Sequence, residues 1–255
     1  MKSKRRHQRR PAKAGASHAG PPIAAPVQAG DPGGLHSVAV WDLPTRLSHA
    51  AMVVLLLLQI MSGQFSLLPG AWHLWVGYAL LVVVLFRLAW GITGSESARF
   101  GPMLASLRQL PGYLPRLFSR RPTYWPGHNP VGSLSSLLLL LLLLVSCTSG
   151  LFIETWAEYR GPLAERVDRS TSVFFNDVHS LVRWPLYALV AIHVLAACAY
   201  WLFKGEDRLR PIFVSGRLAL EDKTTFSFAS NVRAVLVLAM SVCLVAAVVV
   251  LGPIA

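Results

Sequence analysis

The sequence predicts an all-α integral membrane protein with five membrane-spanning helices. The 255-residue chain is 54% hydrophobic and only 14% charged, whereas about a quarter of the residues of a soluble domain are charged. Five apolar runs reach the length of about 18 residues that a helix needs to cross a bilayer while satisfying its own backbone groups. These runs cover approximately residues 48–68, 73–92, 134–153, 178–203 and 234–252.

Residues 1–37 precede the first run and are rich in Lys, Arg, Pro, Ala and Gly. Such a composition cannot build a core, so we expect a disordered basic tail. Its cations either contact anionic lipid head groups, at about 1 kcal/mol each, or stay solvated. His7, His18 and His36 fall in this tail, where we expect no ordered ligation.

Residues 38–220 form the predicted membrane domain, which contains the first four helices. The long loop 93–132 carries apolar residues at roughly helical spacing between Met103 and Leu114, which predicts a helix lying along the membrane surface. The loop 154–177 mixes acidic, basic and aromatic residues, and it is either a partner surface or a plain interfacial cap. Residues 221–255 form a C-terminal segment with the fifth helix.

The net charge of +12 is compatible with a nucleic-acid-binding protein, but its distribution argues for a membrane protein. Most of the 24 lysines and arginines fall in the tail and in the two loops on the same side of the predicted helices. Basic loops stay in the cytoplasm. We therefore expect a cytoplasmic N-terminus, an outer C-terminus, contact with lipid and no nucleic-acid partner. The outer side receives few cations, namely Arg160, Arg166, Arg169 and Arg183.

Four histidines fall within the apolar runs, where ionisable side chains are costly and usually functional. His49 begins the first run, His73 begins the second, and His179 and His193 both lie in the fourth. The last two are 14 residues apart, which in a helix is about 21 Å of rise and about 40° of rotation. They therefore face one direction at two depths.

The alternating direction of the helices gives each of these two histidines a partner at its own depth. The first helix runs outward, so His49 lies at the inner level with His193. The second helix runs inward, so His73 lies at the outer level with His179. Two imidazoles from facing helices form the axial ligand set of a haem iron. The pattern predicts two haems, and because no Cys-x-x-Cys-His motif occurs, both are expected to be non-covalent haem b.

Two other interpretations stay open from the residues alone. A histidine-lined transporter or a metal or proton permease would also place histidines in the membrane, although such proteins usually show broken helices, internal repeats or acidic residues at mid-membrane. We find no repeats and no such acids in this sequence. The chain could also serve only to anchor a soluble oxidoreductase.

Three arginines are candidates to bind the haem propionates, which are anionic. Arg46 precedes His49 by three residues, Arg87 lies near the inner end of the second run, and Arg183 lies one helical turn after His179. For Arg46 and Arg87, anchoring at the inner interface is an equally good explanation.

Several segments together resemble the bacterial cytochrome b561 and nickel-iron hydrogenase b-type cytochrome family over roughly residues 38–220. The matching segments are Val40–His49, His73, Gly77-Tyr78, Phe86–Gly91, Ala98–Gly101, Gly127–Pro130, Gly161–Ala164, His179, His193, Lys204–Asp207 and Ser215–Arg217.

The resemblance implies a four-helix diheme bundle, here with one additional C-terminal helix, whose axial ligands are the four matching histidines. It also implies electron transfer in the bacterial cytoplasmic (inner) membrane between the quinone pool and a redox partner such as a c-type cytochrome, a hydrogenase or a dehydrogenase. We expect His128, in the matching Gly127–Pro130 segment, to have a turn or capping role. Two features depart from the family pattern: Ala50 follows His49 where an aromatic residue is frequent, and residues 1–37 have no counterpart.

Overall fold

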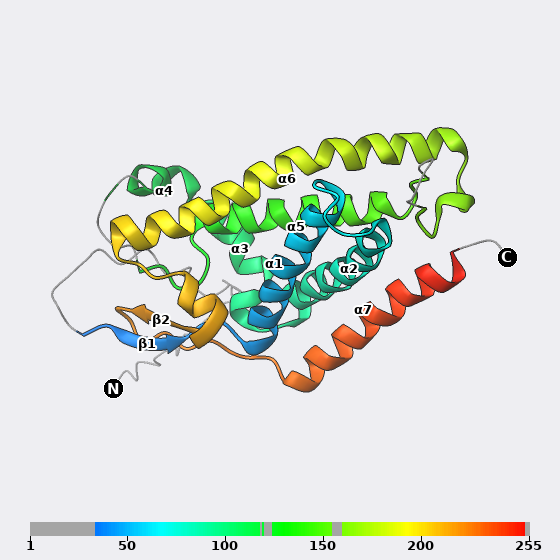
Figure 1. Ribbon diagram of the computed structural model, residues 1–255. Coiled ribbons are helices and arrows are strands. Elements are labelled where there is room, and N and C mark those ends of the chain that lie inside the picture. The colour runs from blue at the N-terminus through cyan, green and yellow to red at the C-terminus, as the bar shows by residue number, and fades with distance from the viewer. Residues whose placement is uncertain (1–33, 118, 120–123, 155–159, 253–255) are drawn as a thin grey trace, which may run out of the picture.

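The computed structural model describes residues 34–117, 119, 124–154 and 160–252, which form seven α-helices and one short β-ribbon (Figure 1). Five of these helices are long and apolar enough to cross a membrane, which confirms the predicted fold class. They are α1 (Leu43–Gly63), α2 (Gly70–Thr93), α5 (Pro130–Gly150), α6 (Arg169–Lys204) and α7 (Asn231–Leu251).

The predicted ends of the helices were wrong by several residues, most of all at α6. This helix begins at Arg169, nine residues before the apolar run, because the Asp168 side chain accepts a hydrogen bond from the backbone N–H of Thr171 at 2.7 Å. It continues through Pro185 for 36 residues, or about 54 Å, which exceeds the hydrocarbon thickness of about 30 Å.

Helix α1 is displaced toward the N-terminus relative to the expected residues 48–68. Asp42 caps its first turn by accepting from the backbone N–H of Thr45 at 2.9 Å. The helix ends at Gly63, and a turn that includes Ser66 with a positive φ of 50° leads into α2. Apolar runs therefore locate the lipid-covered part of a helix, while polar caps determine where it begins.

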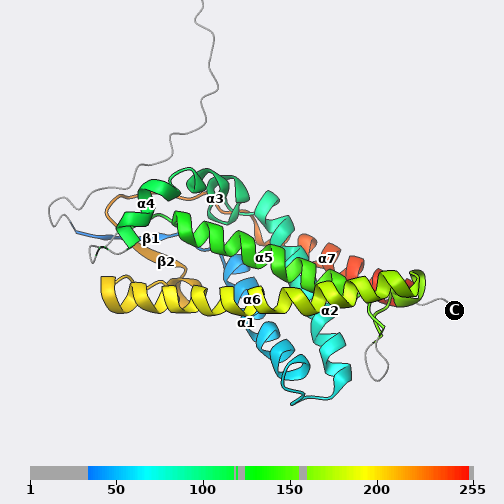
Figure 2. The same ribbon diagram turned by 90° about the horizontal axis from the view of Figure 1, so that it is seen from above.

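The long helices form two pairs that pack against one another. Helix α1 packs against α2, α5 packs against α6, and the pairs join where α2 packs against α5; α7 covers another side of α2 (Figures 1 and 2). The apolar cluster at this contact contains Leu80, Val84, Leu143 and Leu186. Many large apolar side chains elsewhere on these helices are exposed, as expected for surfaces that contact lipid.

The surface helix predicted in the loop after α2 is present as two short helices, α3 (Phe100–Leu107) and α4 (Leu110–Leu117). Helix α3 packs against α5, where the hydroxyls of Ser106 and Ser133 are hydrogen-bonded at 2.8 Å. Pro111 lies in the first turn of α4, where a missing N–H costs little.

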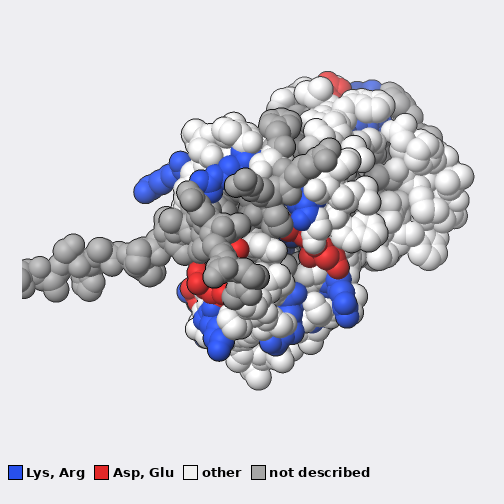
Figure 3. Space-filling view, turned by 90° about the vertical axis from the view of Figure 1, so that its left-hand side faces the viewer, with Lys and Arg blue, Asp and Glu red and all other residues white. Residues whose placement is uncertain are grey.

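The β-ribbon was not predicted. Strand β1 (His36–Ala39) pairs antiparallel with β2 (Arg217–Leu220), and the ribbon buries Val38 and Leu218. His36 therefore belongs to a strand and not to the basic tail, while the rest of that tail, residues 1–33 with His7 and His18, lies outside the described residues. Figure 3 shows basic side chains on this end of the molecule, with acidic side chains among them.

Candidate functional site

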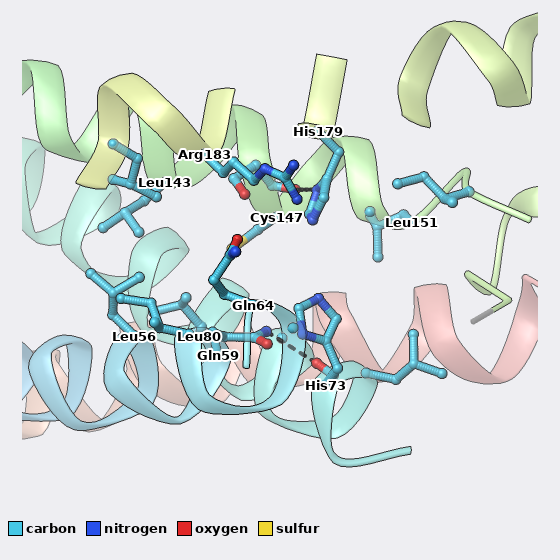
Figure 4. A pocket seen from close by; sticks show the side chains of 18 of the residues that line it. Leu56, Gln59, Gln64, His73, Leu80, Leu143, Cys147, Leu151, His179 and Arg183 are labelled. Atoms are coloured by element: carbon cyan, nitrogen blue, oxygen red, sulfur yellow. Dashed lines mark hydrogen bonds between the residues drawn. The ribbon is translucent and has the colours of Figure 1, made fainter. Parts of the chain in front are cut away.

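His73 and His179 face one another across a cavity. His73 lies in the first turn of α2 and His179 in the N-terminal half of α6, and their ring centroids are 6.2 Å apart with an interplanar angle of 78°. Figure 4 shows the two rings pointing toward one another from opposite walls. A β-carbon on Gly63 of α1 would lie 2.6 Å from Cε1 of His73, so this ring takes its position because residue 63 has no side chain.

The cavity around these two rings is mainly apolar with a few polar groups. Leucines of α1, α2 and α5 form much of its wall, and Gln59, Gln64 and Arg183 also line it (Figure 4). Gln59 Nε2 donates to the carbonyl oxygen of His73 at 3.0 Å, which links α1 to α2.

The candidate residue Arg183 lies on the wall of this cavity beside His179 (Figure 4). Its guanidinium carbon lies 5.1 Å from the ring centroid of Trp184. Its Nε is buried and has no hydrogen-bond partner among the described residues. An anionic group in the cavity would supply the missing acceptor.

The other two histidines are His49 and His193, and they are called the inner group after the orientation expected from the sequence, as His73 and His179 are called the outer pair. His49 lies in the first half of α1 and His193 in the second half of α6. The His49 ring lies 5.1 Å from the ring of Phe213, in the short π-helix η3 (Pro211–Ser215). Leu186 lies midway along α6 between His179 and His193, so the apolar cluster of the helix contact separates the two groups.

Three of the four histidines make a hydrogen bond through Nδ1 to a neighbouring helix. Nδ1 of His73 lies 3.2 Å from the Ser62 hydroxyl, and that of His193 lies 3.2 Å from the Ser135 hydroxyl. Nδ1 of His179 lies 2.9 Å from the carbonyl oxygen of Ser146.

A fourth contact joins the Ser149 hydroxyl to Nδ1 of His179 at 3.2 Å. Each of these hydroxyls also donates its only proton to a backbone carbonyl of its own helix. With its proton on that carbonyl, the hydroxyl accepts from an Nδ1–H. This tautomer leaves the lone pair of the ring on Nε2, the nitrogen that binds a metal when Nδ1 donates.

Basic side chains surround the inner pair. The Arg87 side chain is 5% exposed and donates from Nη1 to the carbonyl oxygen of Ala98 at 3.0 Å. Arg46 donates to the carbonyl oxygen of Val214, and its Nε is buried without a partner among the described residues.

Two further residues of this inner group, His128 and Arg208, were missed as site residues. Each has a buried ring or guanidinium nitrogen with no hydrogen-bond partner in the described part of the chain: Nδ1 in His128 and Nε in Arg208. Burial, helped by Arg87, lowers the pKa of His128 to about 3, so its ring is neutral. Asn129, and not His128, caps α5 by accepting from the N–H of Gly132.

The residues fit a haem at the outer pair. A metal–imidazole bond is about 2 Å long and a ring centre lies about 1 Å behind its nitrogen, so two axial imidazoles on one iron have centroids about 6 Å apart. The observed separation of the His73 and His179 rings is 6.2 Å. Anionic propionates would supply the acceptor that the buried nitrogen of Arg183 lacks.

The model of one protein family, described as prokaryotic cytochrome b561, matches residues 40–215. The chain belongs to this family. The match spans α1 to α6, including all four histidines, and ends before β2 and α7. No curated protein and no solved structure matches the chain.

As a member of the prokaryotic cytochrome b561 family, the chain is a multi-pass membrane protein that binds b-type haem and takes part in electron transfer. This supports electron transfer over a histidine-lined transporter. The serines beside the histidines were not predicted, because the signal by which the histidines were found was an ionisable side chain at membrane depth, and a serine is not ionisable.

Proposed function

We propose that this cytochrome holds two haem b groups at different depths of the bacterial cytoplasmic membrane, with the N-terminus in the cytoplasm and the C-terminus in the periplasm. His73 and His179 would hold the outer haem, and His49 and His193 the inner one. The observation that carries the proposal is the pair of facing rings 6.2 Å apart, of which the His179 ring donates from Nδ1 to a carbonyl.

The protein would position its two cofactors with different polar groups. Arg183 would bind the propionates of the outer haem, and Arg46 and Arg87, together with His128 and Arg208, those of the inner haem. The buried nitrogens without partners in four of these five side chains support this assignment. Charge-assisted hydrogen bonds to carboxylates are about twice as strong as neutral ones, which favours a fixed orientation.

When bound, haem b supplies a one-electron ferric/ferrous couple. The two proposed couples would lie about 21 Å apart along α6, the rise between His179 and His193. The apolar side chains between them, including Leu186, exclude water and ions from the intervening region. A protein with this arrangement can conduct electrons across the membrane while remaining closed to ions.

The partners in this proposal follow from the family resemblance. The cytochrome would exchange electrons between the quinone pool and a redox protein such as a c-type cytochrome, a hydrogenase or a dehydrogenase. The basic cytoplasmic end with β1 and β2 (Figure 3) supports the proposed orientation, because basic segments stay on the cytoplasmic side.

Counting haems in purified single-histidine variants tests the proposal. The wild-type protein should show a reduced b-type spectrum and two haems per chain. His179→Ala should lose the outer haem and His193→Ala the inner haem, while His36→Ala, a histidine of strand β1, should keep both. Retention of two haems in His193→Ala would reject the pairing, and a colourless wild-type protein that transports protons or metal ions would establish the transporter instead.

A further inference from the structure

We propose that Ser62 and Ser149 are positioning residues of the outer haem site and Ser135 of the inner one, and that the inner site has the higher reduction potential because His49 lacks such a partner. This inference rests on the proposed function. The pairing of the histidines identifies the ligands. The inference adds how hydrogen bonds from neighbouring helices orient each ligand and set its effect on the reduction potential.

The direction of each hydrogen bond follows from the protons available. The Ser62 hydroxyl donates to the carbonyl oxygen of Leu58 at 2.9 Å, and the Ser135 hydroxyl to that of Gly132 at 3.1 Å. A hydroxyl has one proton, so each must accept from the histidine at its other contact. Both serines therefore fix the Nδ1–H tautomer and the rotation of the ring.

The outer site has the greater number of these acceptors. His73 donates to Ser62, and the single Nδ1–H of His179 has two acceptors, the Ser146 carbonyl oxygen at 2.9 Å and the Ser149 hydroxyl at 3.2 Å. At the inner site His193 donates to Ser135. Nδ1 of His49 is buried with no hydrogen-bond partner among the described residues.

This asymmetry changes the chemistry of the iron that each pair would bind. An acceptor at Nδ1–H makes the ring a stronger donor through Nε2, as in carboxylate–histidine–metal sites. Stronger donation stabilises the ferric form relative to the ferrous form and lowers the potential of the one-electron couple. The inner site has one ligand without this support. The nearby Arg46 and Arg87 further favour the ferrous form, which carries one positive charge less, whereas the charge of Arg208 is paired with Glu206.

Redox titration of single-haem proteins tests the inference, with dithionite as reductant and the reduced b-type absorbance as the readout. Ser62→Ala and Ser149→Ala are placed in the His193→Ala background, which should keep the outer haem. Ser135→Ala is placed in the His179→Ala background, which should keep the inner haem. Ser241→Ala in α7 is the matched control, because this buried serine donates to the Val237 carbonyl and its described hydrogen bonds reach no histidine.

Ser62→Ala and Ser135→Ala should each favour the ferrous form by about three- to tenfold, the effect of one hydrogen bond, where tenfold is about 59 mV for one electron. Ser149→Ala should shift its couple less, because His179 keeps the Ser146 carbonyl as an acceptor. Ser135→Thr, which retains a hydroxyl, should restore the original potential. In these single-haem backgrounds the inner couple should lie above the outer one.

Unchanged potentials in both Ser62→Ala and Ser135→Ala, with haem bound, would overturn the inference and leave the proposed function intact. An equal shift in Ser241→Ala would also overturn it. Wild-type protein that binds no haem would instead reject the proposed function, so the two failures are distinct.

Discussion

The ring of His73 depends on a residue that has no side chain. Gly63→Ala would place a methyl group 2.6 Å from this ring, and relieving such overpacking costs about 1–3 kcal/mol. We expect the ring to rotate away and haem retention at the outer site to fall about 5- to 100-fold, with the inner haem unaffected. Haem content during dilution into detergent measures this loss.

Gly112→Ala in α4 is the control for this substitution, because a β-carbon there meets nothing within 4 Å. Equal haem loss in both variants would show that Gly63 matters for general stability and not for the position of His73.

Arg183 is expected to hold the outer haem through its charge. Arg183→Gln removes a charge-assisted hydrogen bond, which is worth about 1.5–3 kcal/mol, so haem loss from the outer site should be about 10- to 100-fold faster. Transfer of haem to an acceptor protein, followed by absorbance, measures this rate. Arg160→Gln, which removes an exposed partner of Glu165 on the same side of the membrane, should leave the rate unchanged.

For single residues, sequence reasoning identified the four histidines more readily than the serines and arginines that lie beside them in the fold. A histidine in an apolar run is rare enough to indicate function, and the spacing of His179 and His193 on one helix implied two depths. Serines in helices commonly hydrogen-bond their own backbone, so Ser62 and Ser135 gave no signal until the packing of the helices was known. The contribution of Arg208 depends on a chain reversal after α6 that no local pattern reveals.

At the scale of elements, Asp42 joins the beginning of α1 to the end of α2. Its buried carboxylate caps α1 at Thr45 and also accepts from Trp90 Nε1 at 3.0 Å and from the Ser95 hydroxyl. Asp42→Ala should destabilise the protein by about 2–5 kcal/mol, because it removes a cap and leaves the buried indole N–H without an acceptor. Thermal unfolding in detergent measures the change.

Ser230→Ala is the control for Asp42→Ala, because it removes a helix cap without removing any other hydrogen bond of the kind that Trp90 and Ser95 donate to Asp42. Ser230 caps α7 by accepting from the N–H of Arg233, and losing a cap alone costs about 1 kcal/mol. If both variants unfold at the same temperature, the hydrogen bonds from Trp90 and Ser95 contribute nothing to stability.

The elements themselves were predictable to different degrees. All five long helices were found, because lipid forces any spanning segment to be long and apolar. The start of α6 was missed because polar residues before the apolar run continue the helix outside the lipid. The β-ribbon was missed because its strands have four residues each and pair segments from opposite ends of the membrane domain.

For the whole molecule, the distribution of charge predicts the direction of every helix. A periplasmic reporter enzyme such as alkaline phosphatase, fused after residue 252, should be active, and the same enzyme fused after residue 222 should be inactive, because basic loops stay in the cytoplasm. Enzyme activity in intact cells, normalised to the amount of fusion protein, is the measurement. The reverse pattern would invert the inner and outer assignments of the two haems.

The separation of the long helices into two pairs bears on how rigid the bundle is. Since α2 and α5 provide the main direct contact between the pairs, a flat cofactor held by His73 and His179 would become a second link between them. A bound cofactor would therefore stiffen the bundle at the end where His73 and His179 lie, while its loss would leave the α2–α5 contact as the main one that holds the two pairs together.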